Sequence, residues 1–117
     1  MSNVIAMQPK AEWQEICSLD DLVAYSGISA RVNGVQIALF YVPDAEPSVY
    51  ALDNWCPAAN ANVLARGIVG DINGELVVAS PLYKEHFSLT TGQCLEKALQ
   101  VRVWPVAIHN GTVSVAV

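Results

Sequence analysis

The sequence predicts an all-β fold, a sandwich of antiparallel hairpins with one short helix. The dipeptide Asn-Gly occurs three times, at positions 33–34, 73–74 and 110–111, each time between runs rich in β-branched and apolar residues. Asn-Gly is the strongest short-range signal for a hairpin, because a type I′ turn needs positive φ at both central residues. The regular spacing of the turns predicts a small sandwich or barrel of about eight to ten strands.

The short helix is expected near the N-terminus, over residues 19–25. Ser18 precedes it as a favourable N-cap, and Asp21 stands three residues later, as in a capping box. Gly27 follows as a residue at which such a helix would stop. The rest of the chain carries signals for strands and turns.

Three hairpins follow from the three Asn-Gly turns. The expected strand pairs cover residues 28–32 with 35–42, 67–72 with 75–79, and 100–108 with 112–117. In the last strand the apolar and small residues alternate, as expected for a half-buried strand. Shorter strands are expected over residues 49–52 and 87–89, with a loop over residues 43–47.

The chain has the size of one domain, with 117 residues. Hydrophobic residues form 53% of it and charged residues 15%, which is typical of a globular protein and not of a disordered one. Residues 1–11 show no pattern and are expected to form a flexible arm. Residues 12–117 are therefore the expected folded domain.

The charge and the apolar runs exclude several classes of partner. A net charge of -5, with only 6 basic residues, argues against nucleic acid. No apolar run approaches the roughly 20 residues that a membrane-spanning helix needs, so no membrane partner is expected. The N-terminus lacks a basic region ahead of an apolar stretch, and a cytoplasmic location is the expectation.

The cysteines predict neither disulfides nor a zinc site. Cys17, Cys56 and Cys94 are an odd number and contain no CxxC pair. We expect three reduced, partly buried thiols.

Two segments keep the frame of the loops that hold an iron–sulfur cluster in Rieske domains. Residues 80–87, followed by Thr91 and Gly92, resemble the loop Cys-Pro-x-His-Gly-x-x-Phe with its later Thr-Gly turn, but the two ligand positions hold Ser80 and Tyr83. Upstream, residues 55–58 resemble the other ligand loop, Cys-Pro-His.

The ligand set is therefore incomplete. A Rieske centre needs two cysteines on one iron and two histidines on the other. In the upstream loop Cys56 remains, and Ala58 replaces the histidine. With Ser80 and Tyr83 at the other positions, one ligand of four is present. The sequence resembles a Rieske fold that has lost its cluster.

Nearly the whole chain, from Trp13 onwards, resembles the small subunit of the assimilatory NAD(P)H-dependent nitrite reductase. The resemblance is carried by residues 13–17, 63–67 and 78–82, with Phe87 and Gly92. Cys56 is a departure, because members of that family generally lack the ligand set.

The resemblance implies a cluster-free, non-catalytic subunit of an oxidoreductase of nitrate assimilation. The implied partner is a large subunit that carries sirohaem, an iron–sulfur cluster and FAD and reduces nitrite to ammonium. No catalytic, cofactor-binding or metal-binding residue is then expected on this chain. The alternative is a Rieske-type ferredoxin, the electron carrier of a dioxygenase system, which requires all four ligands.

Two groups of residues remain as candidates for a direct role. Cys56 could act as a redox or nucleophilic thiol if His86 lay beside it as a base, whereas the simpler interpretation is a structural cysteine. Aromatic and apolar residues on the two ligand-like loops could anchor the partner. These candidate partner-binding residues are Trp55, Pro57, Pro81, Leu82 and Tyr83. Alternatively, such side chains fold inward and fill the space of the cluster.

Overall fold

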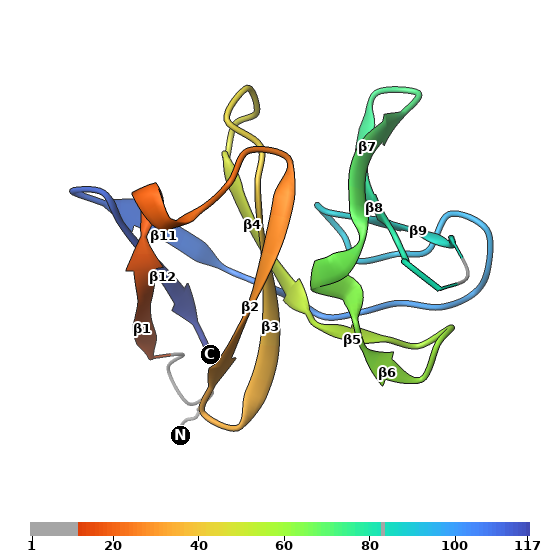
Figure 1. Ribbon diagram of the computed structural model, residues 1–117, viewed down its shortest axis with the longest axis horizontal. Coiled ribbons are helices and arrows are strands. Elements are labelled where there is room, and N and C mark those ends of the chain that lie inside the picture. Colours follow the sequence, from red (N-terminus) through yellow and green to blue (C-terminus); the bar gives the residue numbers. More distant parts are fainter. Residues whose placement is uncertain (1–11, 83) are drawn as a thin grey trace, which may run out of the picture.

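The computed structural model describes residues 12–82 and 84–117, and it confirms the expected all-β fold of antiparallel hairpins (Figure 1). Its regular structure consists of strands and two 3-10 turns, η1 (Leu19–Asp21) and η2 (Leu64–Arg66). The strands are β1 (Trp13–Ser18), β2 (Ser26–Val32), β3 (Val35–Tyr41), β4 (Val49–Asp53), β5 (Trp55–Cys56), β6 (Ala61–Asn62), β7 (Ile68–Ile72), β8 (Glu75–Ala79), β9 (His86–Ser88), β10 (Val103–Trp104), β11 (Val106–His109) and β12 (Thr112–Ala116). The expected flexible arm, residues 1–11, lies outside the described residues.

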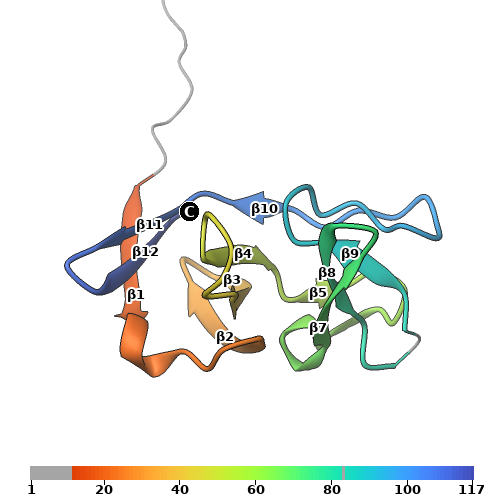
Figure 2. The same cartoon turned by 90° about the horizontal axis from the view of Figure 1, so that it is seen from above.

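The strands form four small antiparallel sheets. Their orders are β1-β12-β11, β10-β4-β3-β2, β5-β6 and β7-β8-β9. In Figures 1 and 2 the first two sheets lie at one end of the molecule, and β5 to β9 lie at the other. No helix in the described part of the chain has the length and hydropathy needed to cross a membrane.

Strand β3 joins two hydrophobic cores. Side chains alternate in direction along a strand, and β3 is buried on both faces. Ile37 and Leu39 pack into one core with Val113 of β12. Ala38 and Phe40 pack into the other core with residues of β8 and β9, such as Phe87. The end of the molecule formed by β5 to β9 is thus fixed to the rest through buried apolar contacts.

All three Asn-Gly pairs form the tight turns that were expected. Both residues have positive φ in each pair: 50° and 80° at positions 33–34, 52° and 88° at positions 73–74, and 51° and 77° at positions 110–111. The two residues that flank each Asn-Gly pair are paired across the turn, as Val32 is with Val35. The local chemistry of the turn therefore sets the strand register in all three hairpins.

The expected helix over residues 19–25 is wrong. Ser18 and Asp21 form the capping box, but it caps a 3-10 turn of only three residues. Leu22 already has extended backbone, with φ -92° and ψ 146°. The Tyr25 N–H then donates to the carbonyl of Tyr41 on β3, at 2.6 Å. Pairing with the neighbouring strand therefore outweighs the local helix signal.

The expected strand over residues 100–108 is also divided. Pro105 separates β10 from β11, because proline cannot donate a ladder hydrogen bond. Strand β10 pairs with β4 in the middle sheet, and β11 pairs with β12. The described residues form 12 strands, more than the expected eight to ten, since no local pattern marks the two-residue strands β5 and β6.

Candidate functional site

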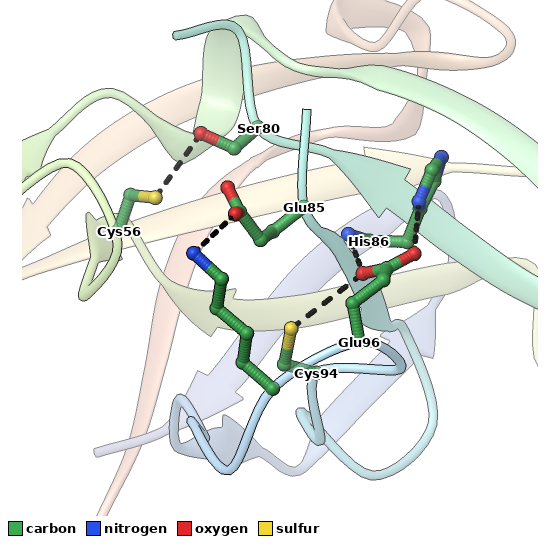
Figure 3. Close-up of polar contacts among 7 residues, drawn as sticks. Cys56, Ser80, Glu85, His86, Cys94 and Glu96 are labelled. Atoms are coloured by element: carbon green, nitrogen blue, oxygen red, sulfur yellow. Dashed lines mark hydrogen bonds and ion pairs between the residues drawn. The ribbon is translucent and has the colours of Figure 1, made fainter. Parts of the chain in front are cut away.

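The two ligand-like loops lie side by side, as the resemblance to the two cluster-holding loops of Rieske domains implies. Cys56 ends β5, and Ser80 follows β8. The Cys56 Sγ and the Ser80 Oγ are 3.1 Å apart and hydrogen-bonded, and both residues are buried (Figure 3). Side chains at two of the four ligand positions therefore meet inside the protein and link the loops directly.

Backbone hydrogen bonds hold each loop in its shape. In the first loop, the Asn60 N–H donates to the Cys56 carbonyl at 2.7 Å. The buried Asn54 side chain accepts from the Ala65 N–H at 2.7 Å and fixes the start of that loop. In the second loop, the Lys84 N–H donates to the Ser80 carbonyl at 3.0 Å. These bonds place Cys56 and Ser80 opposite each other.

The residues present do not fit a [2Fe–2S] group. Among the ligand positions that the structure describes, only Cys56 has a side chain of the required type, because Ala58 has no donor atom and the Ser80 hydroxyl is bonded to Cys56. Tyr83, at the remaining position, lies outside the described residues. In residues 12–82 and 84–117, no group of three or more His, Cys, Asp or Glu side chains is arranged to hold a metal ion.

A third segment, residues 94–99, is attached to the second loop by an ion pair and a hydrogen-bonded pair of side chains, which together we call the latch (Figure 3). The Lys97 Nζ lies 2.8 Å from Oε2 of the buried Glu85. The His86 Nδ1 lies 2.6 Å from Oε2 of Glu96, and the His86 N–H donates to the other Glu96 oxygen at 2.8 Å. Cys94 also contacts Glu96, at 3.7 Å. The latch therefore fixes the loop that carries Ser80.

The proposed pair of Cys56 with His86 is not formed. Cys56 is fully buried and contacts Ser80, whereas the His86 ring is bonded to Glu96. The three cysteines are free thiols, as expected, with Cys56 and Cys94 buried. The structural interpretation of Cys56 is therefore supported.

Most of the candidate partner-binding residues face solvent. Trp55 is 40% exposed and Leu82 is 58% exposed, and Pro81 beside it is also exposed. Pro57 is half-buried. Together these four residues form what we call the tip. The sequence prediction for Tyr83 falls outside the described residues.

The latch makes stability depend on pH through Glu96. The hydrogen bond from the His86 N–H, helped by the bond from its ring, lowers the pKa of Glu96 from its ordinary value of 4.5. On the other side of the latch, the ion pair with Glu85 raises the pKa of Lys97 above 10.5. A lowered carboxyl pKa stabilises the fold above the unfolded-state value, and that contribution is lost as pH falls through the folded-state value.

We expect Glu96→Gln to destabilise the domain at neutral pH, because it removes the charged acceptor of the latch. The stability difference from the parent chain should shrink as the pH falls below 4.5, because Glu96 is then protonated in the unfolded chain, and in the folded chain only at lower pH. Urea unfolding at about pH 7 and about pH 3.5 measures this, with Glu75→Gln, at an exposed residue of β8, as the control. A difference that stays constant between the two pH values would contradict the latch.

The chain matches a known family over nearly its whole length. Residues 12–116 match the family of Rieske-like [2Fe-2S] domains. The chain is 38% identical over 104 residues to a nitrite reductase (NADH) small subunit of Salmonella typhimurium, which covers 88% of this chain and 95% of that protein. It is 49% identical over 106 residues to a nitrite reductase [NAD(P)H] large subunit of Klebsiella oxytoca. That match covers 90% of this chain but only 11% of the length of the relative.

Solved structures show the same fold. The nitrite reductase [NAD(P)H] small subunit of Erwinia carotovora superimposes with a TM-score of 0.75 and 41% identity, over 90% of this chain and 81% of that one. The ferredoxin of carbazole 1,9a-dioxygenase from Nocardioides aromaticivorans has a TM-score of 0.75 and 26% identity, over 89% of this chain and 96% of that one.

Proposed function

This chain belongs to the Rieske-like domain family and, within it, to the small subunits of NAD(P)H nitrite reductase, and on that basis we propose that it supports the catalytic large subunit without a cluster of its own. The reaction would be the reduction of nitrite to ammonium in nitrate assimilation. Sirohaem, an iron–sulfur cluster and FAD would then reside on the large subunit.

The similarity to part of a large subunit is the main observation in favour of binding between this chain and a large subunit. The same domain occurs as a separate small subunit in one relative and as a fraction of a large-subunit chain in another. Domains that are joined in one protein and separate in another are expected to work side by side. The three free cysteines fit a reducing compartment, and we place the complex in the cytoplasm.

The donor set supports the absence of a cluster. Cys56 is one thiolate-forming residue where four ligands are needed, and its sulfur is bonded to Ser80. The latch and the Cys56–Ser80 bond link the loops through side chains of the protein itself. A supporting role therefore suits this chain better than electron transfer through a cluster.

The tip is the proposed contact with the large subunit. Exposed aromatic and apolar residues on adjoining loops are typical of an interface core, in which Trp is a frequent anchor. Trp55, Pro81 and Leu82 have this character and face solvent. Pro57 completes the tip, and Tyr83 is proposed to extend the same surface.

A ferredoxin of a dioxygenase system is the second candidate, and the likeness to the carbazole dioxygenase ferredoxin favours it. Its function needs a redox centre on this chain. The two candidates therefore differ in the iron content of the purified protein.

The test is co-expression of the tagged chain with the nitrite reductase large subunit of the same organism, followed by purification and iron analysis. We expect the chain alone to be colourless and to contain no stoichiometric iron. We also expect it to bind the large subunit in a fixed ratio. Two iron atoms per chain with Rieske-type absorption would instead establish the ferredoxin function.

A further inference from the structure

A hollow of about 310 Å³ lies beside the tip, and its wall includes Trp55. It extends over the end of β4 and the start of the segment that leads into β10. The polar residues on its wall are Gln36, Asp53, Asn62 and Arg102. The hollow thus joins an exposed aromatic residue of the tip to a guanidinium group.

Arg102 is held in place by two neighbours. Its Nε donates to Oδ2 of Asp53 at 2.8 Å, and its guanidinium carbon lies 4.8 Å from the ring centroid of Trp104. The Trp104 Nε1 donates to the other Asp53 oxygen at 2.9 Å. The backbone is fixed as well, because the Asp53 N–H donates to the Arg102 carbonyl at 2.9 Å. Both carboxylate oxygens of Asp53 are therefore used in orienting the guanidinium group.

The outer edge of this guanidinium remains available. The side chain of Arg102 is 64% exposed, and its two terminal nitrogens form no hydrogen bond or ion pair within residues 12–82 and 84–117. A planar guanidinium binds a carboxylate through two parallel hydrogen bonds, and little conformational entropy is lost when it is already oriented. Arg and Trp are also both enriched among the residues that dominate the binding energy of an interface.

We infer that Arg102 receives an Asp or Glu carboxylate of the large subunit, in the hollow beside Trp55. This inference rests on the proposed function, since it extends the contact surface from the tip to the flank of β4 and β10. An exposed ion pair is worth little in water, but the same pair gains strength once a docked partner excludes water from the hollow. A protein carboxylate carried in by the docking of Trp55 therefore suits the site better than a small free anion.

The test measures the affinity of the purified small chain for the large subunit by calorimetry, with Arg102→Lys and Arg102→Met. Arg102→Lys keeps the charge but loses the planar two-donor geometry. We expect both variants to weaken binding about tenfold or more, and Arg102→Met to lower the salt dependence of the affinity. Arg31→Lys, at an exposed arginine of β2, is the matched control and should bind normally.

The outcomes separate this inference from the proposed function. Unchanged affinity of both Arg102 variants, with normal binding by the parent chain, overturns the inference and leaves the proposed function standing. Failure of the parent chain to bind overturns both. Urea unfolding of each variant shows whether the fold is intact, and weakened binding by a folded Arg102→Lys supports the inference even if Arg102→Met is unstable.

Discussion

The double variant Trp55→Ala, Leu82→Ala is expected to lose association with the large subunit while the domain stays folded. The two side chains are 40% and 58% exposed on adjoining loops, so their removal costs the free domain few internal contacts. Interface anchors of this kind cost about 2 kcal/mol or more each when truncated. Affinity should therefore fall by about two orders of magnitude or more.

A matched pair of substitutions is available on the opposite end of the molecule. Trp13 on β1 and Ile108 on β11 are 54% and 40% exposed. The variant Trp13→Ala, Ile108→Ala removes the same kinds of side chain from the sheet that lies away from β5 in Figure 1. It should bind the large subunit as the parent chain does.

The competing interpretation, inward filling, has a different signature. If the tip side chains filled the space of the missing cluster, their removal would lower the free energy of unfolding, and the folded fraction would still bind. Binding measured beside urea unfolding of the same samples decides between the two. A double variant that is stable and binds normally would contradict both, and the contact surface would lie elsewhere.

Local chemistry explains which parts of the fold were predictable. The Asn-Gly turns require only two adjacent residues with positive φ, and all three formed as expected. The frame of the ligand loops also implied that the two loops would be adjacent, and the structure adds the contact between Cys56 and Ser80. The expected helix did not form because Ala24, near its end, pairs with Tyr41 of β3, a strand that lies later in the sequence.

The side-chain contacts that orient Arg102 and form the latch have no local signal in the sequence. Arg102 and Asp53 are 49 residues apart in the chain, and Trp104 and Asp53 are 51 apart. In the latch, His86 and Glu96 are 10 positions apart in the chain, with a turn between them. Spacing patterns of helices and strands do not relate such positions. These contacts depend on tertiary packing and were visible only in the structure.

Gly92 belongs to the frame of the second ligand loop, and its backbone conformation and packing explain why a glycine stands there. Its φ is +78°, and a Cβ atom at this position would lie 2.1 Å from the carbonyl oxygen of Val101. The Gly92 N–H donates to the Ser88 carbonyl at 2.8 Å, and the Gly92 carbonyl accepts from the Val101 N–H at 2.9 Å. The turn after β9 is therefore pressed against the segment that returns from the latch.

Gly92→Ala is accordingly expected to be the most destabilising single substitution considered for this domain. Positive φ at a non-glycine residue costs about 1–3 kcal/mol, and the clash with the Val101 carbonyl adds a comparable amount. Gly111→Ala isolates the first contribution, because Gly111 has a φ of +77° but open space around its Cα. Gly70→Ala, which has neither feature, should be nearly neutral.

In urea unfolding, Gly92→Ala should lower the free energy of unfolding by about 2–6 kcal/mol, which is a large part of a typical domain's stability. Equal stability of Gly92→Ala and Gly111→Ala would show that the close approach is not present. It would also leave the glycine of the ligand-loop frame without a packing reason.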